Sequence, residues 1–174
     1  PVVTQFQAAS TSARREIAIL RFEVVETGTE VAYLVTDSPV PPDASASWQA
    51  SPPLVFPVAS DGLFVLYPWA KDGAGNVSAV YAQPVTVLVD TVAPQILSFR
   101  APAISGQRAI RIDAWDAADE RGITGYLVSF SAEPPSASDD RWTSSAPQNV
   151  LVATDGLFSL YPWVRDAAGN VSAC

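Results

Sequence analysis

Hydrophobic residues alternate with polar ones in short runs along this chain, and no window sustains the 3.6-residue period of an amphipathic helix. The runs are rich in Val, Ile, Phe, Tyr and Trp, and clusters of Pro, Gly, Ser and Asp separate them, as is typical of strands joined by turns. The pattern therefore predicts an all-β protein. We expect strands over residues 2–8, 16–23, 31–36, 54–59, 63–71, 79–89, 95–101, 109–116, 124–130, 149–153 and 157–165.

The chain repeats itself once. Residues 61–79 read DGLFVLYPWAKDGAGNVSA and residues 155–173 read DGLFSLYPWVRDAAGNVSA, and the similarity extends over both halves with a period of about 93 to 94 residues. Such a period is too long for a solenoid turn and suits a β-sandwich domain of roughly 100 residues. We expect two domains, residues 1–90 and 91–174, joined through VDTVAP, where proline stiffens the connection.

The second copy of the repeat is shorter than the first. After the repeated stretch the first copy continues with VYAQPVTVLVD, whereas the second ends at Cys174. We therefore expect the second domain to lack its own last strand. Either this sequence is an excerpt of a longer chain that continues, or a neighbouring chain supplies the strand. An unpaired edge beside an exposed core would otherwise favour aggregation.

Composition excludes several classes of partner. The chain has 174 residues, 48% of them hydrophobic and 16% charged, and its formal net charge is −8 with a single lysine and no basic cluster. A surface that follows nucleic-acid phosphates has no source of cations here. The longest apolar runs are interrupted well before the ~20 residues that a membrane span requires. We expect neither nucleic-acid binding nor membrane insertion within this segment.

Catalytic chemistry has little support in the sequence. The chain contains no histidine, one cysteine at the last position, and no GxSxG, Walker or zinc-ligand pattern. This composition removes histidine-dependent triads and nearly all zinc sites. The acid pair Asp139–Asp140 lies in a Ser-rich loop without an evident aromatic cleft for a sugar. We expect no enzyme and no cofactor, apart from the structural calcium considered below.

The repeated stretch, the TGYLV that precedes a Ser/Pro-rich segment and a Trp, and the DTxAP join together resemble the tandem immunoglobulin-like or fibronectin type III-like repeats of bacterial secreted and cell-surface proteins. The resemblance covers essentially the whole chain. It implies two β-sandwich domains joined end to end, with Phe64 and Phe158 pointing into the cores. It further implies an extracellular or cell-surface location, and other domains of a longer chain or neighbouring subunits as partners. The implied function is a non-catalytic structural spacer or adhesive stalk, with a filament subunit as an alternative.

Aromatic residues of the repeated stretch are the candidate binding surface. Period-2 alternation places Tyr67 and Trp69, and in the second copy Tyr161 and Trp163, on the outer face of a sheet. Exposed Tyr/Trp pairs bind carbohydrates or anchor protein partners. The alternative is that they pack beneath a long loop, such as the Pro-rich segment 37–47. The identical register in both copies favours packing.

The turns DGAGN and DAAGN are the candidate metal-binding segments. Their glycines and Asp/Asn side chains indicate tight turns, and the sequons that begin at Asn76 and Asn170 are interpreted as part of the same turn chemistry. In an immunoglobulin-like topology the acidic loops would converge near the linker. A structural calcium, which needs six to eight oxygens, would then stiffen the joint, with solvated surface acids as the alternative. The candidate ligands are Asp90, Asp116, Asp119 and Asp166.

Overall fold

All regular secondary structure in the computed structural model is β, over the residues that it describes, 1–28, 30–43 and 45–174. The chain divides into two compact units, Pro1–Thr91 (unit 1) and Val92–Cys174 (unit 2), and each is described by itself. The described residues include no helix with the length and hydrophobicity of a membrane span.

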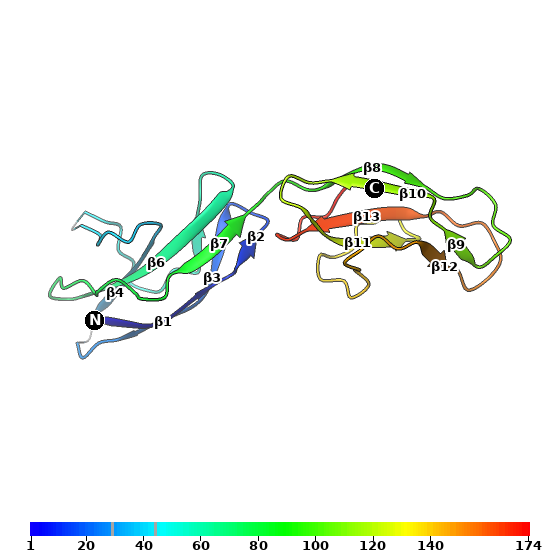
Figure 1. The fold of residues 1–174 in the computed structure, drawn as a ribbon. Helices are drawn as coiled ribbons and strands as arrows, with labels where there is room; N and C mark the ends of the chain where they lie inside the picture. Colours follow the sequence, from blue (N-terminus) through cyan, green and yellow to red (C-terminus); the bar gives the residue numbers. More distant parts are fainter. Residues whose placement is uncertain (29, 44) are drawn as a thin grey trace. The chain divides into compact units, whose positions relative to one another are not determined.

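Unit 1 is built from two sheets with strand orders β1-β3-β5 and β2-β7-β6-β4 (Figure 1). All neighbouring strands run antiparallel except β2 and β7, which are parallel. The strands are β1 (Val2–Ala8), β2 (Thr11–Ser12), β3 (Glu16–Val25), β4 (Val31–Thr36), β5 (Val55–Pro57), β6 (Gly62–Asp72) and β7 (Val85–Val89).

The core of unit 1 lies between these two sheets. One sheet contributes Phe6, Ile17 and Phe22, and the other contributes Leu66 and Val87, all of them buried in one hydrophobic cluster. The rings of Phe6 and Phe22 meet edge to face at 5.5 Å. Alternate residues of each strand point inward, so two half-apolar sheets bury their faces against each other as a β-sandwich.

The last strand of unit 1 is held on both sides and at its end. β7 pairs with β6 on one side, where Leu88 lies opposite Leu63, and with β2 on the other, where Leu88 lies opposite Thr11. Just beyond β7, the Asp61 carboxylate accepts hydrogen bonds from the Thr91 backbone N–H at 2.8 Å and the Thr91 hydroxyl at 2.9 Å. Arg15 Nε lies 3.2 Å from the same carboxylate. We call these three contacts together the Asp61–Thr91 contact. They fasten the end of the last strand to the rest of the unit.

Unit 2 contains six strands in three two-stranded ladders, β8 with β10, β9 with β12, and β11 with β13. The strands are β8 (Gln95–Arg100), β9 (Ala109–Arg111), β10 (Ala114–Ala118), β11 (Ile123–Ser129), β12 (Asn149–Leu151) and β13 (Tyr161–Asp166). The expected strand 109–116 is divided, because Ile112 bonds to Gln148 beyond β9 and Asp113 bonds to Arg100 before β10. The first part of the segment therefore pairs with β12, and the second part pairs with β8.

Two expected strands begin several residues later in the structure, and one strand was not expected. The expected strand 157–165 forms only from Tyr161, because residues 157–160 have no neighbouring strand in unit 2, all of which is described. The expected strand 79–89 forms only from Val85, after Pro84, which has no N–H to donate to a ladder. The two-residue strand β2 was not expected, since its only ladder is the long-range pairing with β7.

The Asp61–Thr91 contact predicts a pH dependence of stability. The hydrogen bonds from the backbone and hydroxyl of Thr91, together with Arg15, lower the pKa of Asp61 below its usual range. A carboxyl whose pKa is lower in the folded state stabilises the fold above its unfolded pKa of about 3.9, and loses this contribution as pH falls through the folded pKa.

We therefore expect the melting temperature of unit 1 to fall as the pH is lowered below about 4, and to fall less in the Asp61→Asn variant. At pH 7 that variant should melt at a lower temperature than the parent. Asp155→Asn, at the corresponding position of unit 2, is the matched control. Thermal melts from pH 2 to pH 7 measure both effects, and an unchanged acid slope in Asp61→Asn would contradict the assignment.

Candidate functional sites on the repeated hairpin

The repeated stretch folds as a strand, a tight turn and a short returning segment in each unit. In unit 1 the Asp72 carboxylate accepts hydrogen bonds from the backbone N–H and the side-chain amide of Asn76, both at 2.8 Å. These bonds lower the pKa of Asp72, the side-chain amide having the larger effect. Gly75 has φ 90°, a conformation that a residue with a Cβ rarely adopts. The turn is therefore specified by its own residues.

Unit 2 builds the same turn more tightly. The Asp166 carboxylate accepts hydrogen bonds from the backbone N–H groups of Gly169 and Asn170, at 2.8 and 2.9 Å, and from the Asn170 side-chain amide at 2.7 Å. Gly169 has φ 93°. The side-chain amides of both sequon asparagines thus bond to the aspartate of their own turn, which agrees with the interpretation of the sequons as turn chemistry.

A buried serine closes each hairpin. The Ser78 hydroxyl accepts a hydrogen bond from the Ala70 backbone N–H at 3.2 Å, while the Ser78 N–H donates to the Ala70 carbonyl at 2.8 Å. In unit 2 the Ser172 hydroxyl accepts from the Val164 N–H at 3.1 Å, and the Ser172 N–H donates to the Val164 carbonyl at 2.9 Å. The last residue of each sequon is therefore a partner of the strand.

The tryptophans of the repeated stretch are buried rather than exposed. Trp69 is 0% exposed and Trp163 is 1% exposed. Each indole N–H donates to a hydroxyl at 2.9 Å, that of Thr36 in unit 1 and that of Ser129 in unit 2. Neither ring presents a face to a ligand, so the expectation of outer-face tryptophans that stack on a partner is wrong. The packing alternative is the one that the structure supports.

The physical reason lies in the segment that follows β4. The Thr36 hydroxyl that accepts from the Trp69 indole donates in turn to the Ser38 carbonyl at 2.8 Å, so the start of the Pro-rich segment lies beside the ring. Residue 44 of that segment is outside the described residues. Tyr67 and Tyr161, the other two candidates, are half-buried. Alternation separates the residues of a strand into two faces, but it carries no information about what covers either face.

A second pair of tryptophans lies beside the cation of each hairpin. The Lys71 ammonium is 4.8 Å from the centre of the Trp48 ring, and the Arg165 guanidinium is 5.1 Å from that of Trp142. Both arrangements are cation–π contacts. Arg165 also donates to the Ala137 carbonyl, which ties it to the loop that carries Trp142. The sequence signal for this pair is the position at which one copy has Lys71 and the other Arg165.

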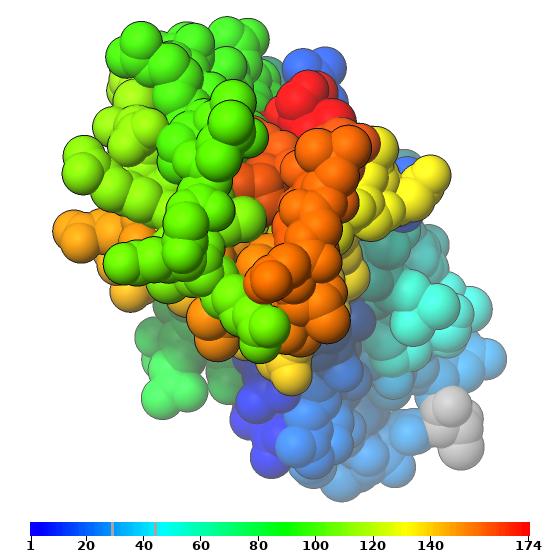
Figure 2. Space-filling model, turned by 90° about the vertical axis from the view of Figure 1, so that its right-hand side faces the viewer, coloured from blue at the N-terminus to red at the C-terminus, as the bar shows by residue number. Residues whose placement is uncertain are grey.

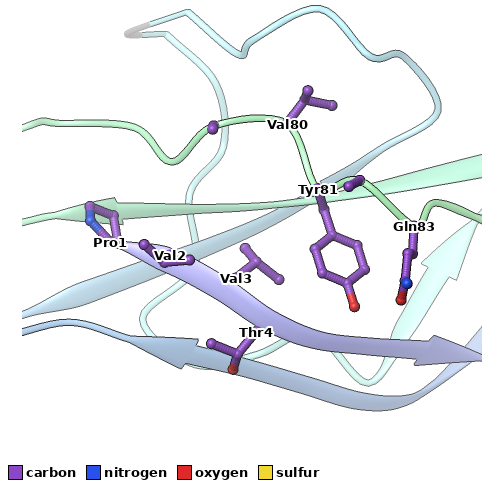
Figure 3. A pocket seen from close by; sticks show the side chains of 9 residues that line it. Pro1, Val2, Val3, Thr4, Val80, Tyr81 and Gln83 are labelled. Carbon is purple, nitrogen blue, oxygen red and sulfur yellow. The ribbon is translucent and has the colours of Figure 1, made fainter.

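Two pockets among the described residues of unit 1 bear on a binding function. One, of about 650 Å³, opens beside the half-buried Trp48 and is also lined by Glu30, Lys71 and Asp72, so it combines an aromatic face with charges of both signs. The other, of about 380 Å³, lies where the irregular segment after the hairpin passes over β1. Figure 3 shows the Tyr81 ring directed toward β1 there. This second pocket has no Asp, Glu, Lys or Arg in its lining.

The candidate calcium ligands differ in their surroundings. Asp166 and Asp90 are buried, Asp119 is half-buried and Asp116 is exposed. Within unit 2, carboxylate oxygens of Asp119 and Asp166 lie within 4.8 Å of each other. Asp119 already accepts a hydrogen bond from the Arg121 backbone N–H at 2.8 Å. Two carboxylates fall short of the six to eight oxygens that calcium prefers. The calcium site at the joint requires residues of both units and stays a prediction.

Comparison with known proteins bears on the fold. No protein-family model and no curated protein matches the chain. Among solved structures, the FN1–FN3 domains of chicken CNTN1 are similar, with a TM-score of 0.54 and 14% sequence identity over 99% of this chain. The fold is fibronectin type III-like. The match spans 64% of that structure, and at this identity it concerns the fold alone.

Removal of the buried hydroxyl in unit 2 tests whether the hairpin is architecture. In Ser172→Ala the Val164 N–H loses its partner inside the protein, so we expect unit 2 to lose about 1–3 kcal/mol of unfolding free energy. Ser159→Ala, at an exposed serine of the same repeated stretch, should change stability by less than about 0.5 kcal/mol. Urea unfolding monitored by tryptophan fluorescence compares the two variants. Equal stability of both would contradict a structural role for Ser172.

Proposed function

We propose that this chain is a non-catalytic structural spacer or adhesive stalk module of a bacterial surface or secreted protein. The proposal rests on the bonding partners of the residues that the two copies share. The tryptophans, serines and aspartates that occur in both copies form hydrogen bonds within their own domain. The repeated residues are therefore those that hold each β-sandwich together. A duplicated catalytic or ligand site would instead keep its repeated polar groups available.

The strand arrangement of unit 1 suits a load-bearing role. Strands near the two ends of the unit, β2 and β7, lie parallel, with Leu88 N–H bonded to the Ser10 carbonyl and Asp90 N–H bonded to the Ser12 carbonyl, both at 3.0 Å. A force applied along the chain would act on these bonds, the β6 ladder and the Asp61–Thr91 contact together. Several hydrogen bonds would then have to break at once before the unit extends.

We place the module at the cell surface or outside the cell, with other domains of a longer chain or neighbouring subunits as its partners. The bacterial context rests on the sequence resemblance, and the extracellular location is supported by the fold type. Unit 1 is held together by apolar packing and the Asp61–Thr91 contact, so its stability does not require a disulfide. Such a module keeps its fold in both oxidising and reducing surroundings.

Mechanical unfolding tests the spacer function. In single-molecule force spectroscopy on the 174-residue chain tethered at its ends, we expect two unfolding events. The event of unit 1 should require the higher force, because unit 2 has no counterpart of the β2–β7 pairing. Asp61→Ala should lower the force of that event alone, with Asp155→Ala as the matched control. Unfolding of unit 1 at or below the force of unit 2 would contradict the load-bearing role.

A binding function is the second candidate, and the pocket beside Trp48 favours it. A half-buried indole next to a lysine and two acids is suited to a carbohydrate or a polar protein segment. In a glycan array and in titrations of the ligands found there, Trp48→Ala should weaken binding at least tenfold, and Trp142→Ala should leave it unchanged. Equal effects of the two variants, or no ligand in the screen, would leave only the spacer function.

A further inference from the structure

The pocket beside Trp48, which we call the Trp48 pocket, lies on one face of the β4–β6 ladder. Alternate residues of a strand share a face, and the register of this ladder places Ala32 opposite Lys71. One step further, Glu30 lies against Gly73, with its Oε2 atom 3.0 Å from the position that a Cβ atom on residue 73 would occupy. Two small residues thus form the floor of the pocket, and Glu30, Lys71 and Trp48 form its walls.

In unit 2 an arginine fills the corresponding space. Arg165 is the counterpart of Lys71, and its Nε atom lies 2.7 Å from the position that a Cβ atom on Gly125 would occupy. Unit 1 has Ala32 in place of that glycine, so the side chain of residue 71 has no room to lie down in the same way. Arg165 is also fixed by its bond to the Ala137 carbonyl. The space is therefore open in unit 1 because its residues differ from those of unit 2.

The other residues that open the pocket also differ between the two copies. Unit 2 has Ala167 in place of Gly73 and Ile123 in place of Glu30. Gly73 does not have a positive φ, and alanine occupies its place in the same turn of unit 2, so the turn does not require a glycine here. The missing side chain instead gives the Glu30 carboxylate its room. The β-sandwich does not depend on these residues.

Two opposite charges of the pocket are available to a ligand. Among the described residues, neither the Glu30 carboxylate nor the Lys71 ammonium forms a hydrogen bond or an ion pair, and Lys71 contacts only the Trp48 ring. The two groups are too far apart to pair with each other. The carboxylate of Asp72, by contrast, already accepts two hydrogen bonds from Asn76. The pocket therefore presents one free cation and one free carboxylate within the part of the chain that the structure describes.

The backbone of β4 adds a donor and an acceptor beside these charges. β4 is an edge strand of its sheet, and Tyr33 exchanges backbone hydrogen bonds of 2.8 and 2.9 Å with Gln49 on the side away from β6. Peptide groups two residues apart point to the same side, so those of Val31 also point away from β6. Within the described residues they have no partner on that side. The cyan part of the chain, which includes residues 45–50, reaches the surface in Figure 2.

We propose that the Trp48 pocket binds dipeptides and other short peptides with free termini. The ammonium group of the ligand binds the Glu30 carboxylate, and its carboxylate binds the Lys71 ammonium. Its amide pairs with the free N–H and C=O of Val31, as an added strand would. Side chains at diagonal positions of neighbouring strands are about 7–8 Å apart, a distance that an extended dipeptide spans at about 3.3–3.6 Å per residue.

This inference rests on the binding function proposed for the same pocket and is independent of the spacer function. A peptide agrees with the pocket better than a neutral sugar does, because the two free charges are of opposite sign and an unpaired strand edge lies beside them. The Trp48 ring packs against an apolar side chain of the ligand.

Dialanine is the probe, and its two blocked forms are the controls. In an NMR titration of the 174-residue protein, dialanine should shift the signals of the Val31 N–H and the Trp48 indole N–H until they saturate. The indole signal of Trp142 in unit 2 should stay in place. N-acetyl-dialanine and dialanine amide each lack one of the two charges. Each should bind roughly two- to fivefold more weakly than dialanine, as expected for the loss of one exposed ion pair.

Substitutions identify the partner of each charge. Glu30→Gln should weaken dialanine binding by a similar factor, and N-acetylation of the ligand should then have no further effect. Lys71→Met, which keeps the length of the side chain, should abolish the effect of amidation in the same way. Glu133→Gln, at an exposed acid of unit 2, is the matched control and should leave the affinity unchanged.

Gly73→Ala tests the room that the glycine provides. The added Cβ displaces the Glu30 carboxylate, so dialanine should bind at least twofold more weakly. The melting temperature of unit 1 should change little, because unit 2 forms the same turn with Ala167. This variant separates a loss of binding from a loss of folding.

Three results would overturn the proposal. They are the absence of a saturable shift with dialanine, equal binding of the blocked forms, and an unchanged affinity in both Glu30→Gln and Lys71→Met. A glycan that requires Trp48 while dialanine does not bind would keep the binding function and reject this inference. Binding of dialanine without any glycan would assign the pocket to peptides. Failure of the spacer function would appear separately, as a low unfolding force of unit 1 without any ligand.

Discussion

The pairing of β7 on both of its sides is the interaction on which unit 1 depends. A strand that bonds to β6 and β2 joins the last part of the unit to its middle and to its beginning. This closure buries Leu66, Val87 and Val89 completely. Because backbone N–H and C=O groups must be paired when they are buried, the strand contributes both the cover for the core and the partners for its neighbours.

Unit 2 shows what the same sequence pattern does without that pairing. The stretch GLFSL in residues 156–160 is nearly identical to GLFVL in residues 62–66, which forms the first half of β6. In unit 2 the strand begins only at Tyr161. Strand formation here is therefore decided by the presence of a neighbour rather than by local propensity. The hairpin turn, whose bonds are local, forms in both units.

The sequence predicted local features well and long-range features poorly. Period-2 alternation placed the strands 2–8 and 31–36 at the bounds that the structure shows. The resemblance to fibronectin type III-like repeats, and not the alternation, pointed Phe64 into the core, against which it packs. Alternation missed β2 and the burial of Trp69, because both depend on segments distant in sequence. The hydrophobic pattern of a strand shows which residues share a face. It does not show which strands lie beside it or which segment packs over each face.

The bond between Asp61 and Thr91 also bears on where one module ends. Thr91 lies in the VDTVAP join, which reads in the sequence as a neutral connection, yet its N–H and hydroxyl both bond within unit 1. The join is thus asymmetric, since its first half belongs to the preceding fold. A gene fragment that ends at Val89 would encode every strand of unit 1 but omit the residue that its aspartate holds. For recombining such repeats, the natural cutting point follows Thr91.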